Sequence, residues 1–487
     1  MAIVLNFDLH EFWHLAIVTL AALLEIVACG HAILYKKEPR STIAWVGLIL
    51  LVPLVGAVLY FVFGVNRLRR RAILLRGQME RYRASLLQKE CPPEELHLHL
   101  PPHTGYLDKL ARVVGTVVER PLLPGNEIEP LVNGDEAFPA MLEAIRSARK
   151  TISLQTYIFD RDAVGLEFAS ALGEAVRRHV EVRVLIDSAG TRYSLPTIMH
   201  VLRRENVRHA RFLPSLLPWS VTTLNLRTHR KFLIIDGRIG FTGGMNIRAG
   251  NCLKKNPAHP VQDLHFRARG PVVAQLQEAF ADDWMFTTRE ALRGEAWFPE
   301  QEPAGTVLAR GIADGPDEDF EKLRWTLLGA LSIARRSVKI VTPYFLPDRA
   351  IIDSLNLAAM RGARVEILLP AENNLPFVQW ASRAMWWQIL EHGSRIWLTR
   401  PPFDHSKLMV VDDSWVLVGS ANWDARSLRL NFEYNLECYD PALVARMDAL
   451  FESKRAGAHE VKQEEVNGRG LPLRFLDGVA RLLSPYL

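Results

Sequence analysis

The sequence predicts an α/β protein in which two tandem copies of one α/β unit follow an amino-terminal pair of apolar helices. Helical and strand patterns alternate from residue 110 onward, and one helix–strand–helix–strand order occurs twice. A set of five residue types also recurs at the same spacing in both copies. With 487 residues, the chain is too long for one compact core, since domains cluster at roughly 100–200 residues.

The composition is typical of a folded protein and excludes some kinds of site. Hydrophobic residues make up 49% and charged residues 23%, which excludes a disordered or fibrous chain. The four cysteines are far apart and form no CxxC pair, which excludes a disulfide framework and a thiolate zinc site. The formal net charge of +5 indicates only that anionic partners are tolerated.

Residues 1–65 predict a membrane hairpin with spans at about 12–35 and 42–64. The second stretch carries no charge and is long enough for a helix to cross the roughly 30 Å hydrocarbon core. The first stretch is also long enough, but it contains Glu25, so a re-entrant or interfacial helix stays open beside a full span. A signal peptide is disfavoured because the basic segment that starts one is absent.

Basic residues predict on which side of the membrane the rest of the chain lies. The connector between the apolar stretches holds three Lys or Arg, whereas residues 67–83 hold seven. The larger cluster is expected to stay in the cytoplasm, together with both termini. Residues 66–109 are expected to form a basic juxtamembrane linker, in which 67–83 either lies against anionic headgroups or forms a solvated helix.

Residues 110–300 and 301–455 are expected to form the two α/β units. The segment 148–159 aligns without gaps with 334–345, and the same elements flank both segments. These elements are an amphipathic helix before each segment and a β-branched strand after it: Asp135–Ala148, Glu318–Ala334, Val180–Ile186 and Ala363–Leu369. The seam between the units is expected in the loop Glu295–Thr306, where proline and glycine cluster.

Each unit ends in the same polar motif, over 229–246 in the first and 405–422 in the second. His, Lys, Asp, Gly and Asn recur at identical offsets, and Gly or Ser fills one further matched position. The matched residues are His229 and His405, Lys231 and Lys407, Asp236 and Asp412, Gly243 and Gly419, and Asn246 and Asn422.

This set of residue types suits a phosphate group. Side chains at i and i+2 of a strand share a face, so each Lys would hold phosphate oxygens beside its His. The imidazole can attack phosphorus or move a proton. Asn246 and Asn422 can donate a further hydrogen bond to a phosphoryl oxygen. The apolar runs Phe232–Ile235 and Leu408–Val411 indicate buried strands, and the glycine after each turn would let the backbone approach the site closely.

If the units pack around a pseudo-twofold axis, His229 and His405 can face one phosphorus from opposite sides. One would attack, and the other would protonate the leaving oxygen and then deprotonate the next nucleophile. Asp263 and Glu433, which follow the two motifs, are candidates for orienting the imidazoles.

The motif carboxylates Asp236 and Asp412 belong to the catalytic candidates, but structural support is the better interpretation of both. No metal or other cofactor is expected, because two lysines and two asparagines would surround the phosphate charge. The sequence also lacks an Asp-rich metal cluster.

The doubled HxKxxxxDx6G[GS]xN motif resembles that of the phospholipase D superfamily. The apolar pair of helices narrows the resemblance to bacterial cardiolipin synthases, as do the blocks Arg40–Trp45, Gly243–Ile247, Gly419–Ser427 and Asn431–Glu433. The resemblance covers almost the whole chain. It implies a phosphohistidine on His229, with His405 as acid and base, although the residues alone leave open which histidine attacks.

The resemblance implies transphosphatidylation: two phosphatidylglycerol molecules give cardiolipin and glycerol. It further implies phospholipids and the bilayer of a bacterial cell membrane as partners. A phospholipase D hydrolase and another headgroup-exchange enzyme, such as a phosphatidylserine synthase, stay open as alternatives. A nuclease is less favoured, because no long basic and aromatic track marks a nucleic-acid channel. A non-catalytic scaffold would leave the doubled motif unexplained, and the oligomeric state stays open.

Three apolar segments outside the motifs have two interpretations each. Phe212–Val221 and Leu375–Trp387 could line the approach of acyl chains or could be buried core. Residues 456–487 are expected to form a linker and an amphipathic helix. That helix would lie in the membrane interface or pack back onto the protein. Its apolar stripe consists of Leu473, Leu476, Val479, Leu482 and Leu483.

Overall fold

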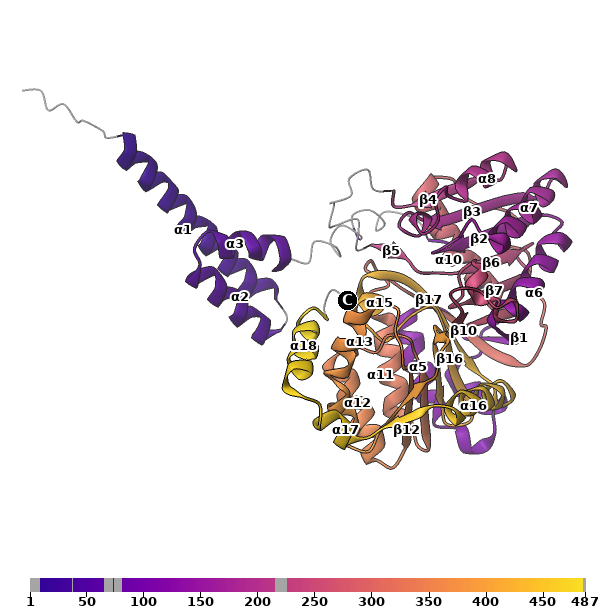
Figure 1. The fold of residues 1–487 in the computed structure, drawn as a ribbon. Coiled ribbons are helices and arrows are strands. Elements are labelled where there is room, and N and C mark those ends of the chain that lie inside the picture. The colour runs from indigo at the N-terminus through magenta and orange to yellow at the C-terminus, as the bar shows by residue number, and fades with distance from the viewer. Residues whose placement is uncertain (1–8, 37, 65–72, 74–80, 215–225, 485–487) are drawn as a thin grey trace, which may run out of the picture. The chain divides into compact units, whose positions relative to one another are not determined.

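The computed structural model describes residues 9–36, 38–64, 73, 81–214 and 226–484. The chain forms two compact units, residues 1–71 and 72–487, and each is described by itself (Figure 1).

The first unit is helical. Helix α1 (Leu9–Tyr35) is continuous, and its stretch Phe12–Tyr35 has a mean hydropathy of 2.2. By length and composition, this stretch can cross a membrane. Helix α2 (Pro39–Leu51) is apolar but shorter. A small core joins the helices, and His31 Nδ1 lies 2.7 Å from the hydroxyl of Tyr60.

The single helix expected over 42–64 is wrong, because the chain is interrupted after α2. Helix α3 (Val55–Leu59) follows the break, and one π-helical turn, Tyr60–Gly64, follows α3. Pro53 has no amide hydrogen to continue the helical ladder, and Leu54 has a positive φ of 63°. The proline therefore separates two short helices where the hydropathy pattern alone predicts one long helix.

One mixed sheet runs through the second unit. The strands in the first half of this unit are β1 (Leu123–Val132), β2 (Thr151–Thr156), β3 (Glu181–Asp187), β4 (His209–Phe212), β5 (Arg227–Thr228), β6 (Phe232–Ile235), β7 (Ile239–Gly243), β8 (Val261–Gln262) and β9 (Leu264–Arg269). Those of its second half are β10 (Val307–Asp314), β11 (Ser337–Val341), β12 (Arg364–Pro370), β13 (Arg395–Thr399), β14 (Phe403–Asp404), β15 (Leu408–Val411), β16 (Trp415–Gly419), β17 (Asn431–Tyr439) and β18 (His459–Val461). Strands β8 and β14 form a separate two-stranded pair.

The strand order is the same in both halves when it is followed outward from the antiparallel pair β1–β10. The first half runs β1-β9-β7-β6-β2-β3-β4, and the second runs β10-β17-β16-β15-β11-β12-β13. In each half the first four pairings are antiparallel and the next two are parallel. The second half has one more strand, β18, which pairs antiparallel with β13 at the edge of the sheet. The predicted α/β fold with two related units around a pseudo-twofold axis is confirmed.

Helices cover the sheet in both halves (Figure 1). Their bounds are α5 (Leu107–Val118), α6 (Asn133–Ser147), α7 (Ala163–Arg177), α8 (Met199–Arg204), α10 (Val272–Thr288), α11 (Lys322–Ile333), α12 (Arg349–Met360), α13 (Pro376–Arg383), α14 (Trp386–Leu390), α15 (Ala425–Arg429), α16 (Pro441–Ala456), α17 (Gln463–Asn467) and α18 (Leu471–Leu482). Short 3-10 turns lie at Ala84–Leu87, Pro93–Leu98, Pro102–Thr104, Gly190–Arg192, Ala249–Asn251 and Leu253–Lys255.

Aspartate caps start matched helices in the two halves. The carboxylate of Asp162 accepts a hydrogen bond from the amide of Gly165 at the start of α7. Asp348 accepts from the amide of Ile351 at the start of α12 in the same way. Each cap satisfies one amide that lacks a helical partner and contributes about 1 kcal/mol. The predicted helices and strands flanking the repeated segments are confirmed as α6, α11, β3 and β12, although α11 begins four residues later than expected.

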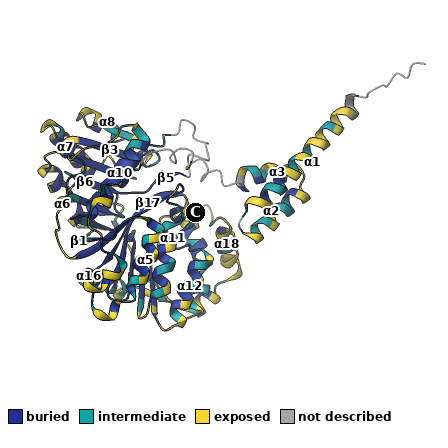
Figure 2. Ribbon diagram, turned by 180° about the vertical axis from the view of Figure 1, so that it is seen from behind, coloured by how far each residue is buried: buried dark blue, intermediate teal, exposed yellow. Residues whose placement is uncertain are grey.

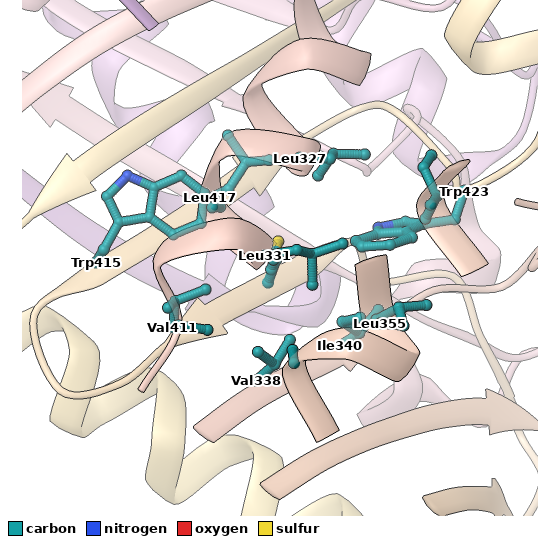
Figure 3. Packing of buried hydrophobic residues seen from close by; sticks show 14 of the residues in the cluster. Leu327, Leu331, Val338, Ile340, Leu355, Val411, Trp415, Leu417 and Trp423 are labelled. Atoms are coloured by element: carbon teal, nitrogen blue, oxygen red, sulfur yellow. The ribbon is translucent and has the colours of Figure 1, made fainter. Parts of the chain in front are cut away.

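Each half has a hydrophobic core between the helices and the sheet. In the second half, α11 and α12 cover strands β11 and β15 (Figure 3). The side chains packed there include Leu327, Leu331, Val338, Ile340, Leu355, Val411, Trp415, Leu417 and Trp423. Burial of each such side chain stabilises the fold by roughly 1.5–3 kcal/mol.

Residues 81–109, which the sequence predicts to be part of a basic juxtamembrane linker, pack against the helices and strands of the second unit. Arg81 donates to both carboxylate oxygens of Asp319, at 2.8 and 2.9 Å. The amide of Ser85 donates to Glu278, a fully buried residue of α10, at 2.5 Å. A buried carboxylate needs such partners. The count of basic residues leaves 67–83 either against anionic headgroups or in a solvated helix, because it cannot show that Arg81 has an internal acid to pair with. Most of that stretch, 67–72 and 74–80, lies outside the described residues.

Candidate active site

Two short strand pairings bring the repeated motifs together. Strand β5 pairs in parallel with β17 of the other half, and β14 pairs in parallel with β8. Each pairing ends in a matched hydrogen bond. The amide of His229 donates to the carbonyl of Phe432, and the amide of His405 donates to that of Gln262, both at 2.8 Å. Each motif histidine therefore lies against a strand of the opposite half.

The two histidines are held by carboxylates that come from the opposite half. His229 Nδ1 lies 2.9 Å from Glu433 Oε2, and His405 Nδ1 lies 2.8 Å from Asp263 Oδ2. The two ring centroids are 6.3 Å apart at an interplanar angle of 79°. The sequence identifies all four residues, but each carboxylate pairs with the histidine of the other motif and not with the one it follows.

The histidines lie between strands, so the strand placement expected for them is wrong. Residues 229–231 connect β5 to β6, and 405–407 connect β14 to β15. The Lys231 ammonium donates to the carbonyl of His229 at 2.6 Å, and Lys407 bonds to His405 in the same way. Both lysines are almost fully buried. Lys407 Nζ also lies 2.9 Å from Nδ1 of His405, so this lysine stands beside the imidazole as well as bonding to the backbone.

The motif aspartates bind backbone amides away from the histidines. Asp236 accepts from the amides of residues 149–151, at 2.7 to 2.9 Å. Asp412 accepts from the amides of residues 335–337. Both have positive φ values, of 51° and 54°. These contacts tie the β6–β7 and β15–β16 turns to the starts of β2 and β11, which supports the structural interpretation of both residues.

The motif asparagines line the same pocket as the histidines. Asn246 accepts from the amide of Ile158 through Oδ1 at 3.0 Å, which orients its NH₂ group as a donor. Before each asparagine, the chain passes close to a neighbouring strand at a glycine. A Cβ on Gly243, whose φ is 152°, would lie 2.8 Å from the Cα of His265. The predicted close approach of the backbone is confirmed there.

Burial and neighbouring charges change the basicity of the site. Burial lowers the pKa of His229, and the Lys231 ammonium lowers it further, against the raising effect of Glu433. Burial and the Lys407 ammonium lower the pKa of His405 to about 4. Both imidazoles are therefore neutral at pH 7.

The lysines and carboxylates shift in complementary directions. Burial lowers the pKa of Lys231 to about 7 and that of Lys407 to about 8. Burial alone would raise the pKa of Glu433 and of Asp263, but the paired histidines and nearby lysines outweigh it and lower both. The carboxylates consequently stay ionised. They fix the proton of each neutral imidazole on Nδ1 and leave the lone pair of Nε2 for chemistry.

The pocket around the histidines has a volume of about 610 Å³ and differs in polarity between its two sides. Beside His229, the paired strands β5 and β17 contribute Arg227 and Asn431. At the matched places beside His405, strands β14 and β8 contribute Phe403 and Val261. One side thus offers a cation and an amide, and the other offers apolar surface.

Several pocket residues escape the sequence analysis. The ring of Tyr157 lies 5.5 Å from that of His229, and the ring of Tyr344 lies 6.3 Å from that of His405. Both tyrosines sit in the aligned segments 148–159 and 334–345, but one position out of register. That offset hides their equivalence from a gap-free comparison. Three pocket arginines, Arg227, Arg248 and Arg426, carry no repeated signal in the sequence.

The apolar segments behave differently from each other. Phe212 is buried against Phe286 and Phe432, which makes it core, and 215–221 lie outside the described residues. In the segment Leu375–Trp387, Leu375 and Val378 line the pocket, whereas Trp386 is buried.

Comparison with known proteins supports one family. A model described as "Cardiolipin synthase, PLD-like domain" matches residues 141–284 and 327–455. A second model, described as the N-terminal segment of phospholipase D-nuclease proteins, matches residues 17–64. The chain is 31% identical to cardiolipin synthase 1 of Bacillus anthracis, over 93% of this chain and 90% of the relative. It is 30% identical to cardiolipin synthase 2 of Staphylococcus epidermidis, over 96% of this chain and 97% of the relative.

A solved structure has the same fold. Phosphatidylserine synthase of Haemophilus influenzae superposes with a TM-score of 0.62 at 16% identity, over 78% of this chain and 100% of that one. At that identity, the likeness concerns the fold alone.

Proposed function

The chain belongs to the family of cardiolipin synthases with phospholipase D-like domains, and we propose that it converts two phosphatidylglycerol molecules into cardiolipin and glycerol. The observation that carries this proposal is the pair of imidazoles whose ring centroids lie 6.3 Å apart in one pocket, each held at Nδ1 by a buried carboxylate. Two such groups suit a double displacement at phosphorus, because one can attack while the other moves protons.

In the first step, Nε2 of His229 attacks the phosphorus of one phosphatidylglycerol. The bond from phosphorus to the glycerol headgroup oxygen breaks, and His405 in its protonated form gives that oxygen a proton. Glycerol leaves, and the phosphatidyl group stays on His229. The pKa of His405 is about 4, but a bound phosphodiester adds negative charge beside the ring and raises it.

In the second step, a free hydroxyl of the second phosphatidylglycerol gives its proton to the now neutral His405. The oxygen attacks phosphorus, the bond from phosphorus to His229 breaks, and cardiolipin forms. Water is the competing nucleophile, so transfer requires that the lipid hydroxyl occupy the pocket ahead of water.

The assignment of His229 as the nucleophile is supported by its carboxylate. Once phosphorylated, the imidazole carries positive charge, which Glu433 must balance. Glu433 also accepts from the hydroxyl of Ser420 at 2.5 Å and from the amide of Asn431 at 3.2 Å. These donors hold the carboxylate in its ionised form. Lys231 and Lys407 balance the phosphate charge, and the amides of Asn246 and Asn422 are proposed to hold its oxygens.

An amino-terminal apolar helix and the family together indicate a membrane protein. We further propose a hairpin with spans near 12–35 and 42–64, the second bent at Pro53, and a cytoplasmic catalytic unit. Within that unit, we propose that residues 110–300 and 301–455 are the two repeats. A reporter fused after Lys36, in the connector, and a reporter fused after residue 487 should lie on opposite sides of the membrane. Reporters on the same side would contradict the hairpin.

The test of the reaction is product analysis of the full-length protein in micelles that contain only labelled phosphatidylglycerol. We expect cardiolipin and glycerol in equal amounts. His229→Ala should abolish both products, whereas His209→Ala, which changes a half-buried histidine of β4, should leave them unchanged. Phosphatidic acid as the main product would contradict the proposal and indicate hydrolysis.

A further inference from the structure

Helix α18 buries one acid and one alanine against the protein, while its large apolar side chains are exposed. Asp477, which is 1% exposed, is bound by Arg383 of α13 at 2.8 Å and also by Arg469. The other buried residue of the helix, Ala480, packs with Val378 and Ala381 of α13. This arrangement is the reverse of an ordinary surface helix, in which the apolar stripe faces the core.

The apolar side of α18 faces away from the protein. Much of α18 is exposed (Figure 2). Phe475 is 75% exposed, and Leu482 is 73% exposed. The start of α13 adds two more exposed apolar residues, Leu375 and Phe377. We call this surface the α13–α18 face; its residues are Leu375, Phe377, Leu471, Leu473, Phe475, Leu476, Val479, Leu482 and Leu483. Scattered exposed leucines are ordinary on a protein surface, but a continuous group of this kind marks an interaction site.

The α13–α18 face is continuous with the apolar side of the active-site pocket. Val378 lines the pocket and also packs against Ala480 of α18. Leu375 lines the pocket while remaining 46% exposed. Farther inside, the same pocket is lined by Phe403 and Val261. Apolar surface therefore leads from the outside of α18 to His405.

The size of the pocket indicates what this surface contacts. A volume of about 610 Å³ is typical of a site for a small molecule or a lipid headgroup. The acyl chains of two phosphatidylglycerol molecules cannot all be enclosed by it. They need apolar surroundings next to the pocket, and the α13–α18 face lies there.

The charges of α18 favour an anionic partner. Asp477 is the one acid between Leu471 and Leu482, and it is buried. Both arginines of the helix, Arg474 and Arg481, are exposed. Exposed apolar side chains flanked by arginines are typical of helices that lie in the interface of an anionic bilayer.

We propose that the α13–α18 face inserts into the surface of an anionic lipid bilayer and that lipids pass from there into the apolar side of the pocket. The inference rests on the proposed function in one respect: phosphatidylglycerol substrates supply the negative charge that the arginines meet. A second copy of the chain or the amino-terminal helices are the other occupants that the experiments below distinguish.

Contact with lipid can be measured on the full-length protein in vesicles of phosphatidylglycerol and phosphatidylcholine. A bimane fluorophore is attached at Phe475→Cys, and spin-labelled lipids serve as the quencher. The matched control carries the label at Leu166→Cys, an exposed apolar position on α7. Both variants include Cys29→Ser, because the other three native cysteines are buried.

We expect lipid quenching at position 475 to exceed that at position 166 by about threefold or more, since the interface buries apolar side chains to a depth of about 5–10 Å. Equal quenching at the two positions would overturn the inference. A disulfide between the 475 positions of two copies of the unlabelled Phe475→Cys variant, formed under oxidation, would overturn it in favour of a protein occupant, as would protection of the label without lipid quenching.

Activity separates this surface from the catalytic chemistry. The variant Phe475→Ser/Leu482→Ser is compared with unmodified protein on long-chain phosphatidylglycerol in vesicles and on monomeric dihexanoyl phosphatidylglycerol. We expect about a tenfold lower rate on vesicles and a change of less than about twofold on the short-chain lipid, because two large apolar contacts with the bilayer are lost. Equal losses on both lipids would overturn the inference. If unmodified protein turns over neither lipid, the proposed function fails, and lipid quenching still decides the α13–α18 face.

Discussion

The two histidines of the active site are held alike, but the carboxylates that hold them have different hydrogen-bond partners. Glu433, which holds His229, also accepts hydrogen bonds from the hydroxyl of Ser420 and the side-chain amide of Asn431. Asp263, which holds His405, accepts instead from the backbone amide of Leu264, at 2.8 Å. The fold thus repeats the geometry of the site without repeating its electrostatics.

One sequence position accounts for much of this difference. Ser420 of the second motif corresponds to Gly244 of the first. The Ser420 hydroxyl bonds to Glu433, whereas a Cβ on Gly244 would collide with the carboxylate of Asp263. A symmetric scaffold can therefore give its two histidines unequal roles by changing a few contacts around the carboxylates. The following predictions test how unequal the two halves are.

The largest effect is expected when the carboxylates lose their charge. Glu433→Gln should lower kcat by about 10³-fold and Asp263→Asn by about 10²-fold, because loss of an orienting carboxylate charge costs up to about 10⁴-fold in hydrolytic triads. Glu433 has the larger effect because it balances the charge of the phosphohistidine. The measurement is cardiolipin formation at saturating phosphatidylglycerol, with circular dichroism as the control for folding. A larger loss from Asp263→Asn would reverse the assigned roles.

The titration of Lys231 and Lys407 should affect the dependence of kcat/KM on pH. Lys231 has a pKa of about 7 and Lys407 of about 8, both lowered first by burial. A lysine is charged below its pKa, so rising pH removes the charge that attracts the phosphodiester. We expect kcat/KM to fall through two steps between about pH 7 and 9, by up to about tenfold per pH unit above each pKa. A profile that stays flat to pH 9 would contradict this assignment.

A smaller effect is expected at the position where the halves differ. Ser420→Ala removes one hydrogen bond to the ionised Glu433, an interaction that contributes about 1.5–3 kcal/mol, so kcat should fall by about 10- to 100-fold. Ser427→Ala provides a control with the same substitution in the same half, on a buried serine whose backbone amide donates to Asp424, the cap of α15. If both variants lose the same activity, the Ser420 hydroxyl has no special role.

The motif aspartates should affect stability in both halves and activity in neither, with the larger effect at Asp412, which also accepts from the hydroxyl of Tyr106. Asp236→Asn and Asp412→Asn each weaken three backbone contacts. We expect each to lower the free energy of unfolding by about 1–3 kcal/mol and to leave kcat per folded molecule unchanged. Urea denaturation and active-site titration measure the two quantities. A selective loss of kcat in one variant would show that this aspartate acts on the chemistry.

The sequence predicts the fold and most of the site residues because the repeat is visible in one dimension. Identical spacing identifies His229 and His405, and the apolar runs identify strands β6 and β15. The crossed pairing with Glu433 and Asp263 is not visible, since it depends on the strand pairs β5–β17 and β8–β14, which connect residues about 140 to 200 apart.

Other differences have local physical causes. The helical interruption at Pro53 is hidden by hydropathy, which measures apolarity and not backbone hydrogen bonding. Which face of α18 packs on the protein cannot be predicted from the sequence, because an amphipathic pattern does not reveal whether an acid of the helix has an internal partner. Here Arg383 and Arg469 provide that partner for Asp477.

The central claim, that His229 attacks and His405 moves the protons, can be tested with a phosphatidyl ester of p-nitrophenol. This leaving group departs without a proton, so the first step no longer needs His405. We predict that His405→Ala releases one equivalent of p-nitrophenol in a burst and then stops, with the phosphatidyl group on His229. His229→Ala should give no burst. A burst from His229→Ala, with the lipid attached to His405, would contradict the account.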